Sequence, residues 1–330
     1  MKLCLVSRAF ASAVAVSFAA IALGCAPSFH EGPLPGAPTN ATYADVAGAR
    51  VRYVDVGEGP AVVLLHGFAS SLETWVTVIP ALSKKHRVIA LDLKGFGWTS
   101  RPEGDYSPAA QAKLVVALMD ARGIETATVV AHSWGSSVAL AMSMATPARV
   151  ARLALYDAWV YEEQIPTFFQ WSRAPGIGEA LFSLFYGERA DERMEAAFYD
   201  KQKWVTERLV EDVERALERP GTTAAALAAT RGQKFAAVQD RYKTIEQPTL
   251  LLWGREDLVT TLAQGERLAR DLPHAKLVVY PRCGHFPMLE ASRASTADLT
   301  AFIDEVAAPP AVVAPPPRSE PQPTPTPEKP

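Results

Sequence analysis

Ser133 lies in a short segment whose residue types could support nucleophilic chemistry. The segment reads Ala131-His132-Ser133-Trp134-Gly135, with an apolar run before it and a helix-like run after it. A serine on a tight turn between a strand and a helix presents its hydroxyl, and small residues two positions away on either side allow the turn to close. This is the nucleophile elbow G-x-S-x-G, except that Ala131 replaces the first glycine. The alternative is that Ser133 only caps the following helix.

Short apolar runs predict the strands that would position such a turn. Residues 51–56 alternate like a strand, and runs without alternation follow at 61–65, 88–91, 128–131, 152–156, 250–253 and 277–280. Runs without alternation indicate strands buried on both faces, and helix-like stretches such as 108–122 separate them. The sequence therefore predicts an α/β fold with a mainly parallel sheet, whose chemistry takes place beyond the carboxyl ends of the strands.

From about Tyr43 to Val306 the chain resembles the α/β-hydrolase family. The matching stretches occur in the family's order: Leu64-Leu65-His66-Gly67-Phe68, 92–100, 131–135, 252–257 and Gly284-His285-Phe286-Pro287. The resemblance implies a mainly parallel sheet of the eight-stranded type, flanked by helices and carrying an inserted helical cap. We therefore expect a hydrolase domain over 42–306, with the cap at about 158–246.

The resemblance also implies a catalytic triad in the chain order Ser–Asp–His. Ser133 would be the nucleophile, and His285 would take its proton and later protonate the leaving group. Asp257 would hold the imidazole in the correct tautomer and stabilise its charged form. The oxyanion hole would consist of the backbone N–H groups of Phe68 and Trp134.

Other polar residues compete for these roles. Asp157 also ends a strand, at the place that some subfamilies use for the acid, and is the alternative acid. His66 and His132 match family positions that are usually structural. We expect Asp92 to organise the loop that follows it and Cys283 to be a small packing residue.

The connection between Tyr156 and Thr249 is about 90 residues long, far more than a crossover requires. Its first part, Trp159 to Tyr186, holds eight aromatic residues in 28, which could line an apolar pocket or form the core of the cap. Further on, apolar residues recur at helical spacing until a Pro-Gly pair ends the pattern: Val205, Leu209, Val213, Leu217 and Pro220-Gly221.

The predicted reaction is hydrolysis of a carboxylic ester of a small or medium apolar substrate through an acyl-enzyme. Position 133 lacks the carboxylate nucleophile of haloalkane dehalogenases and epoxide hydrolases. The loop 68–71 lacks the Gly-Pro-Gly-rich sequence of proline iminopeptidases. A carbon–carbon bond hydrolase acting on a diketone and a non-catalytic surface binding lipoprotein are the alternatives. We expect no metal and no cofactor, since the sequence contains no metal-ligand cluster and no phosphate-binding loop.

The first 25 residues predict export. Lys2 and Arg8 are followed by an uncharged run of 15 residues, 9–23, which suits a secretory signal and is short for a transmembrane helix. Ala22-Leu23-Gly24-Cys25 resembles a bacterial lipobox, which implies a lipid anchor at Cys25. Ordinary cleavage, for instance after Ala22, is the alternative. We therefore expect the protein in the bacterial cell envelope, at the outer membrane or on the periplasmic face.

The proline content divides the rest of the chain. Of the 26 prolines, 14 lie in two flanks, 26–41 and 307–330, which we interpret as a flexible tether and a disordered tail. A hydrophobic content of 48% excludes a mostly disordered chain. A formal net charge of −3 excludes a strongly basic nucleic-acid binder, so the expected partners are a small ester-type substrate and the membrane.

Overall fold

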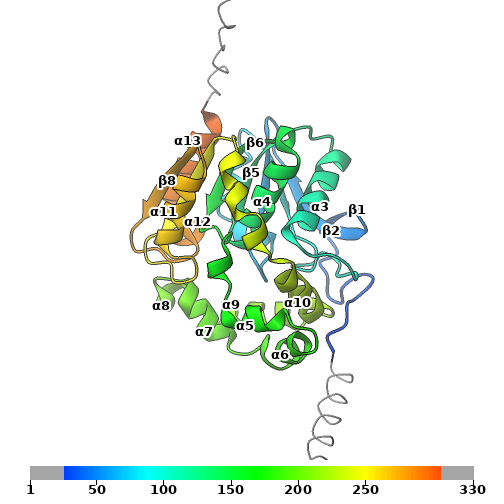
Figure 1. The fold of residues 1–330 in the computed structure, drawn as a ribbon. Helices are drawn as coiled ribbons and strands as arrows, with labels where there is room; N and C mark the ends of the chain where they lie inside the picture. Colours follow the sequence, from blue (N-terminus) through cyan, green and yellow to red (C-terminus); the bar gives the residue numbers. More distant parts are fainter. Residues whose placement is uncertain (1–25, 306–330) are drawn as a thin grey trace, which may run out of the picture.

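The computed structural model describes residues 26–305, so Cys25, the predicted signal and the tail 307–330 lie outside the described residues. Its eight strands form one sheet in the order β1-β2-β4-β3-β5-β6-β7-β8 (Figure 1). The pairs β1·β2 and β2·β4 are antiparallel, and every other neighbouring pair is parallel. The predicted α/β fold with a mainly parallel sheet is confirmed.

The seven predicted strands are all present. They are β2 (Ala49–Val56), β3 (Ala61–Leu65), β4 (Arg87–Leu91), β5 (Ala127–His132), β6 (Val150–Tyr156), β7 (Thr249–Gly254) and β8 (Ala275–Tyr280). The strand that the sequence did not reveal is β1 (Thr42–Val46), at the edge of the sheet. It has no fully buried residue, and so it lacks the apolar run that marks the central strands.

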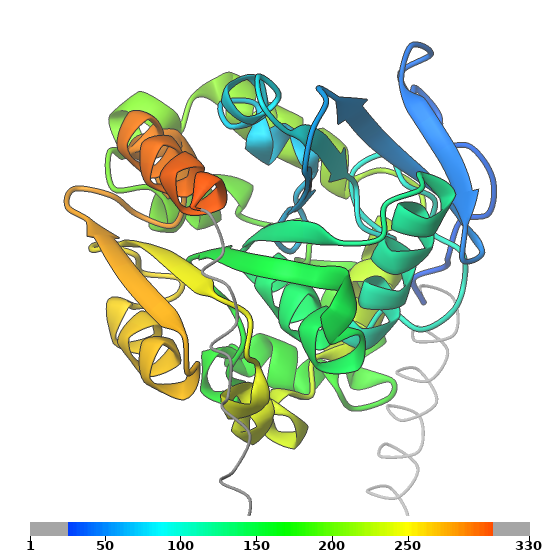
Figure 2. The same ribbon diagram turned by 90° about the horizontal axis from the view of Figure 1, so that it is seen from above.

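Helices cover both faces of the sheet (Figure 2). Alternate residues of β3 enter the two cores: Val63 and Leu65 pack on one side, and Val62 and Leu64 on the other. The first core is closed by α3 (Pro108–Ala121), α4 (Trp134–Ala145) and α11 (Leu262–Asp271). The second is closed by α2 (Ile79–Leu82), α12 (Pro287–Glu290) and α13 (Ser292–Asp304).

The chain between β6 and β7 forms a group of helices at one end of the sheet (Figure 1). They are α5 (Thr167–Ser172), α6 (Ile177–Phe185), α7 (Ala190–Ala197), α8 (Lys201–Trp204), α9 (Glu207–Leu217) and α10 (Thr222–Gly232). The helix predicted from the i+4 repeat is α9, which begins after the cap Thr206 and therefore leaves Val205 outside. Within residues 26–305, no helix combines the length and apolarity that crossing a membrane requires.

Short 3-10 turns complete the fold. They are η1 (Leu72–Trp75), η2 (Pro147–Arg149), η3 (Glu162–Gln164), η4 (Phe235–Ala237) and η5 (Gln239–Thr244).

The segment predicted as a flexible tether packs on the body instead. The ring of Phe29 stacks on Tyr106 with 5.8 Å between centroids, and the His30 N–H donates to the carbonyl of Arg101 at 3.1 Å. Leu34 is only 5% exposed. The high proline and glycine content suggested a free segment, but residues 29–34 also contain Phe29 and Leu34, whose side chains pack on the folded body.

Candidate active site

Ser133 alone forms the turn between β5 and α4. Strand β5 ends at His132 and helix α4 begins at Trp134, and Ser133 between them has φ 52° and ψ −124°. A non-glycine residue in such a conformation costs about 1–3 kcal/mol, so its surroundings must hold it. The Ser133 N–H donates to the carbonyl of Tyr156 at 2.9 Å, and its own carbonyl accepts from the N–H of Trp159 at 3.1 Å.

The neighbours of this turn explain its small residues. A Cβ on Gly135 would lie 2.5 Å from the carbonyl oxygen of His66, so α4 approaches β3 too closely for any side chain there. Ala131 is fully buried in β5 and keeps regular pairing with Leu65 and Leu155. The strand thus accommodates the alanine that departs from the motif, whereas position 135 requires glycine.

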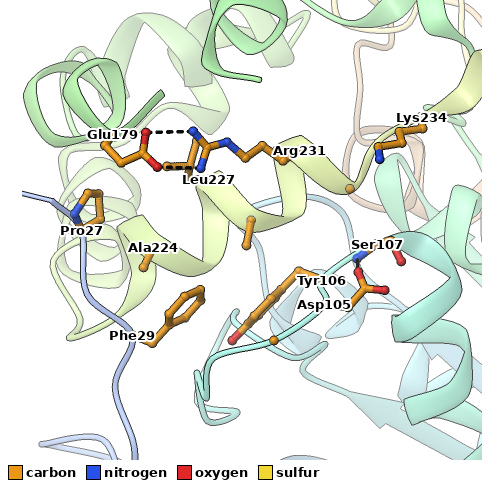
Figure 3. A pocket seen from close by; sticks show the side chains of 13 residues that line it. Pro27, Phe29, Asp105, Tyr106, Ser107, Glu179, Ala224, Leu227, Arg231 and Lys234 are labelled. Carbon is orange, nitrogen blue, oxygen red and sulfur yellow. Dashed lines mark hydrogen bonds and ion pairs between the residues drawn. The ribbon is translucent and has the colours of Figure 1, made fainter. Parts of the chain in front are cut away.

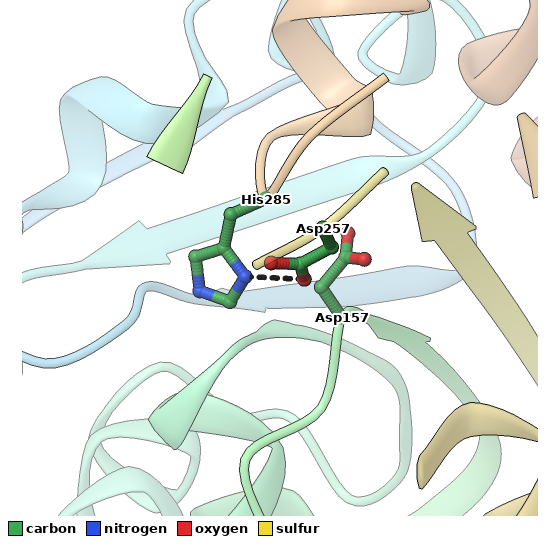
Figure 4. Close-up of side chains that lie close together, drawn as sticks. All are labelled: Asp157, Asp257 and His285. Carbon is green, nitrogen blue, oxygen red and sulfur yellow. Dashed lines mark hydrogen bonds and ion pairs between the residues drawn. The ribbon is translucent and has the colours of Figure 1, made fainter. Parts of the chain in front are cut away.

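Asp257 and His285 form the central contact of the site (Figure 4). The Nδ1 atom of His285 lies 2.7 Å from Oδ2 of Asp257, and both residues are almost completely buried. Burial alone would raise the pKa of Asp257. The charge of His285 and the hydrogen bonds from Thr260 outweigh burial and hold that pKa below its usual range. Asp257 is therefore a carboxylate that fixes the tautomer and orientation of the imidazole.

Thr260 is a residue of this site that the sequence did not single out. Its hydroxyl donates to Oδ2 of Asp257 at 2.6 Å and lies 3.3 Å from Nδ1 of His285. The N–H groups of Thr260 and Val259 donate to the other oxygen of Asp257 at 3.0 and 2.7 Å. The signal that could have found Thr260 is its place three residues after the acid, where a hydroxyl can turn back to a carboxylate.

Asp157 lies beside this pair without binding the imidazole (Figure 4). Its Oδ1 accepts from the N–H of Gly254 at 2.9 Å, while its buried Oδ2 has no hydrogen-bond partner. Burial raises the pKa of Asp157 well above its usual range, and the neighbouring charge of Asp257 raises it further. Burial and the charge of Asp257 thus favour the neutral form of Asp157, and the hydrogen bond to His285 favours Asp257 as the acid.

Among residues 26–305, Asp157, Asp257 and His285 form a group whose ligand atoms all lie within 4.8 Å of one another, close enough to suit a metal ion. The ring nitrogen that would bind a cation is already held by Asp257, and both oxygens of Asp257 accept hydrogen bonds. The arrangement is a hydrogen-bonded network and not an open cation site.

The remaining polar candidates have structural partners. His66 receives the Leu93 N–H on Nε2 at 2.9 Å, and its Nδ1 lies 2.7 Å from the carbonyl of Gly67, which fixes the loop after β3. Nε2 of His132 lies 2.8 Å from the carbonyl of His285. Burial, followed by the charge of His285, holds the pKa of His132 well below its usual range, so it stays neutral.

Asp92 and Cys283 behave as the sequence indicated. The carboxylate of Asp92 accepts the N–H groups of Leu72 at 2.7 Å and Trp98 at 2.8 Å, and a Cβ on Gly97 would lie 2.2 Å from it. Asp92 thus organises the loop after β4. Cys283 is fully buried, and burial raises the pKa of its thiol, which makes it a packing residue and a poor nucleophile.

His132, the residue before Ser133, contacts the imidazole of His285. The rings of His132 and His285 are 4.7 Å apart, but within residues 26–305 no hydrogen bond joins the Ser133 hydroxyl to the imidazole. Such contacts are often long in free enzymes and shorten when substrate binds. A Cβ on Gly67 would lie 3.0 Å from Cβ of Ser133, so the loop after β3 passes directly over the serine.

The two predicted oxyanion donors flank this loop. Trp134 is the first residue of α4, where backbone N–H groups have no partner within the helix. Phe68 follows the loop glycine, and its ring contacts Trp134 edge-on with centroids 6.0 Å apart.

Aromatic side chains of the cap reach the same loop. The Phe68 ring lies 5.2 Å from Phe169 of α5 and 6.5 Å from Tyr186 at the end of α6, and Phe182 stacks on Tyr186 at 5.0 Å. Trp171 and Phe185 instead point outward and are 63% and 55% exposed. The aromatic-rich segment thus supplies the wall above Phe68 and part of the packing of the cap.

The family model for the alpha/beta hydrolase fold matches residues 60–292, which include every motif of this site. The chain belongs to the α/β-hydrolase family.

Relatives of this chain are named for different substrates. The chain is 30% identical to a 2-hydroxy-6-oxo-2,4-heptadienoate hydrolase of Pseudomonas putida, over 74% of this chain and 90% of that one. A solved meta-cleavage product hydrolase of Pseudomonas fluorescens is 30% identical, with a TM-score of 0.70 over 80% of this chain and 97% of that one. The solved Est816, described as an N-acyl homoserine lactone degrading enzyme, is 26% identical, with a TM-score of 0.66 over 79% of this chain and all of its own.

Proposed function

We propose that this hydrolase cleaves carboxylic esters of uncharged, apolar acids through an acyl-enzyme on Ser133. The observation that carries the proposal is the buried Asp257–His285 contact of 2.7 Å at the side of a strained Ser133 turn. A carboxylate that fixes Nδ1 leaves Nε2 of the imidazole free to act as a base.

In the proposed reaction, Nε2 of His285 takes the hydroxyl proton while Oγ of Ser133 bonds to the acyl carbon. The carbon–oxygen bond of the ester then breaks, and the leaving alkoxide takes the proton from His285. A water molecule repeats the steps on the acyl-enzyme and releases the acid and free Ser133. The N–H groups of Phe68 and Trp134 would stabilise the oxyanion, at about 3 kcal/mol for each donor.

The aromatic rings around Phe68 favour a substrate whose acyl group is uncharged. The rings near Phe68 are Phe96, Trp134, Phe169 and Tyr186, none of which can neutralise a substrate carboxylate. Burying an unpaired carboxylate costs several kcal/mol or more. The buried cation nearby, Arg101, is already bonded to the carbonyls of Gly97 and Thr99 and to the hydroxyl of Thr222.

Carbon–carbon bond hydrolysis is the second candidate, and the names of the relatives favour it. The relative from Pseudomonas putida is named for a dienoate that carries a ketone, and it is 30% identical over most of both chains. The same Ser133 attack would apply, but the leaving group would be a carbon that must be protonated, and the substrate would bring a carboxylate into the aromatic wall.

Comparison of kcat/KM between esters and a dienoate substrate distinguishes ester hydrolysis from carbon–carbon bond hydrolysis. We expect p-nitrophenyl esters of increasing acyl length to be turned over with a preference for small or medium apolar acyl groups. We expect 2-hydroxy-6-oxo-2,4-heptadienoate to be poorer by at least 10-fold in kcat/KM, about 1.4 kcal/mol in the barrier. The reverse order would assign the protein to carbon–carbon bond hydrolysis.

A fluorophosphonate probe separates an enzyme from a non-catalytic binding lipoprotein. We expect covalent labelling of the wild-type chain and none of Ser133→Ala. Ser136→Ala is the matched control, because Ser136 lies one turn of α4 away and is fully buried. Labelling that survives Ser133→Ala, or its absence in folded wild type, would overturn the nucleophile assignment.

We further propose that the protein is exported and lipid-anchored through Cys25. The support is the sequence alone: two positive charges, an uncharged run of 15 residues and the stretch ending at Cys25. Radiolabelled palmitate should be incorporated into the wild-type chain in a bacterial host and not into Cys25→Ser, with Cys4→Ser as the control.

A further inference from the structure

Helix α6 has apolar residues on its inner side and on its outer side. Its inner residue Phe182 is buried against Phe168 and Tyr186, with ring centroids 5.3 and 5.0 Å apart. Its outer side exposes Ile177, Leu184 and Phe185 by 54%, 62% and 55%. The apolar stripe of a surface helix normally faces the core of the protein, so apolar residues on the outer side of α6 require another explanation.

The outer residues of α6 and Trp171 of α5 form what we call the cap face: Trp171, Ile177, Leu184 and Phe185. They are four of the eight large hydrophobic residues that are exposed in the described part of the chain, and they fall within 15 consecutive positions. Clustered exposed apolar residues mark a surface that meets a partner.

The amino-terminal segment leaves the body next to helices α6 and α10. Pro27 lines a cavity of about 620 Å³ together with Glu179 of α6 and Leu227 and Arg231 of α10 (Figure 3). Further along, His30 packs against the start of α10, because a Cβ on Gly221 would come within 2.8 Å of the His30 backbone nitrogen. The stack of Phe29 on Tyr106 completes the attachment.

This attachment limits the distance between an anchor and the cap. Cys25 precedes Pro27 by two residues, and an extended chain spans at most about 3.6 Å per residue. A membrane anchor at Cys25 would therefore hold α6 next to the lipid surface. A free tether of 16 residues, as the composition suggested, would impose no such orientation.

The charges near the cap face also suit a lipid interface. Glu179 is the one ionisable residue within α6, and both of its oxygens are paired with Arg231 at 2.7 and 2.8 Å (Figure 3). The hydrogen bonds from Arg231 lower the pKa of Glu179 to about 2, so the pair stays formed at neutral pH. An internally neutralised pair reduces the cost of bringing this helix to an apolar phase.

We propose that the cap face docks on the surface of a lipid bilayer, with the outer side of α6 in the interfacial region. Interfacial helices bury their apolar side about 5–10 Å into the headgroup boundary, and a second contact strengthens a lipid anchor. The inference rests on attachment at Cys25 for its orientation and is independent of which bond the active site cleaves.

The test uses the chain expressed with Cys4→Ser in a bacterial host, with Cys25 acylated and its sulfur therefore blocked, and reconstituted in phosphatidylcholine vesicles. A polarity-sensitive dye is attached to Phe185→Cys on the cap face or to Ala297→Cys, an exposed position on α13 at the far end of the molecule (Figure 1). Cys283 is fully buried and does not compete for the dye. Because both labelled proteins keep the proposed lipid anchor at Cys25, the body stays close to the vesicle in both.

We expect a blue shift at position 185 on addition of vesicles, quenching there by brominated lipid chains, and neither effect at position 297. Adding Ile177→Gln and Leu184→Gln should abolish the shift. Val76→Gln, which removes a residue 63% exposed elsewhere, should leave it unchanged.

Equal behaviour of the two labelled positions would overturn the proposal. A blue shift at position 185 that needs no vesicles and grows with protein concentration would assign the face to a second copy of the chain, and would overturn it as well. Absence of palmitate from the labelled protein together with a retained shift would refute the lipid anchor only, and neither result bears on ester hydrolysis.

Discussion

At the residue scale, the site contains two buried carboxyl groups whose pKa values are shifted in opposite directions. Asp257 keeps its charge because His285 and Thr260 stabilise it, whereas Asp157 has one donor, the Gly254 N–H, and an oxygen without a partner. Two carboxylates this close cannot both ionise at low cost, so the better-solvated one takes the charge. Burial and the charge of Asp257 together therefore favour the neutral form of Asp157.

This coupling predicts that Asp157 becomes active as an acid when Asp257 is lost. In Asp257→Asn the charge that raises the pKa of Asp157 disappears, and its oxygen lies within 4.8 Å of His285 Nδ1. We expect Asp157→Asn to change kcat less than 3-fold, and Asp257→Asn to lower kcat by about 10²-fold instead of the roughly 10⁴-fold loss seen for a sole acid. The double variant, which lacks both carboxylates, should show the roughly 10⁴-fold loss of kcat.

The kcat values of wild type, the two single variants and the double variant are measured by steady-state kinetics on the best ester. Circular dichroism verifies that each variant is folded. If the two single effects simply add, Asp157 does not take over the role of Asp257. Wild-type kcat in Asp257→Asn would instead show that Asp257 is not the acid at all.

The neutral state of Asp157 also predicts a pH dependence of stability. An unfolded aspartate ionises near pH 3.9, and the folded pKa of Asp157 is raised by burial and by Asp257. Between these two values the unfolded state binds fewer protons than the native state, so Asp157 lowers stability as pH rises. Asp157→Asn removes this penalty.

The free energy of unfolding of Asp157→Asn relative to wild type should therefore increase from pH 4 upward, by at most about 1.4 kcal/mol per pH unit. Urea unfolding at several pH values measures it. Asp45→Asn, at an exposed position on β1, should show no such trend. A difference that is flat with pH would mean that Asp157 is ionised in the native state.

At the element scale, the position of Ser133 depends on how closely α4 approaches β3. The carbonyls of Leu65 and His66 leave 2.7 and 2.5 Å for a Cβ on Gly135, less than any real contact allows. Backbone carbonyls cannot rotate away as a side chain would, so a methyl group there must push the start of α4 outward. Trp134, the proposed oxyanion donor, would move with it.

We therefore expect Gly135→Ala to destabilise the fold by about 1–3 kcal/mol and to lower kcat more than it raises KM. Gly187→Ala is the matched control, because a Cβ there meets nothing within 4 Å. Urea midpoints and ester kinetics of both variants give the comparison. Equal stability of the two variants would show that the helix can shift without cost.

The sequence revealed the strands that carry a continuous apolar run or a clear alternation. Continuous apolar runs mark β3 to β8, and five motifs in a fixed order placed Ser133, Asp257 and His285 at their carboxyl ends. It missed β1, whose residues are all partly exposed, and Thr260, whose role depends on a loop that turns back to Asp257. Both depend on tertiary contacts that leave no periodic pattern.

At the scale of the whole molecule, Arg101 joins the body, the cap and the amino-terminal segment. It is 1% exposed, and its guanidinium binds the carbonyls of Gly97 and Thr99 and the hydroxyl of Thr222 at the start of α10. Its carbonyl also accepts the N–H of His30. Burial lowers the pKa of Arg101 to about 10, which still leaves it charged at neutral pH. One buried cation therefore connects three parts that are distant in sequence.

The packing of the amino-terminal segment predicts that it contributes to global stability. Leu34 is 5% exposed in a stretch whose composition alone suggests a free tether, and truncation of a buried leucine costs about 2–5 kcal/mol. We expect Leu34→Ala to lower the free energy of unfolding of the full chain by about 2–3 kcal/mol with an unchanged m-value, as for any core residue. Leu258→Ala, which truncates a leucine that is 76% exposed, should change it by less than about 0.5 kcal/mol. Equal urea midpoints for Leu34→Ala and wild type would mean that the amino-terminal segment is detached from the body in solution. The proposed orientation of α6 toward the membrane would then lose its basis, because it depends on this attachment.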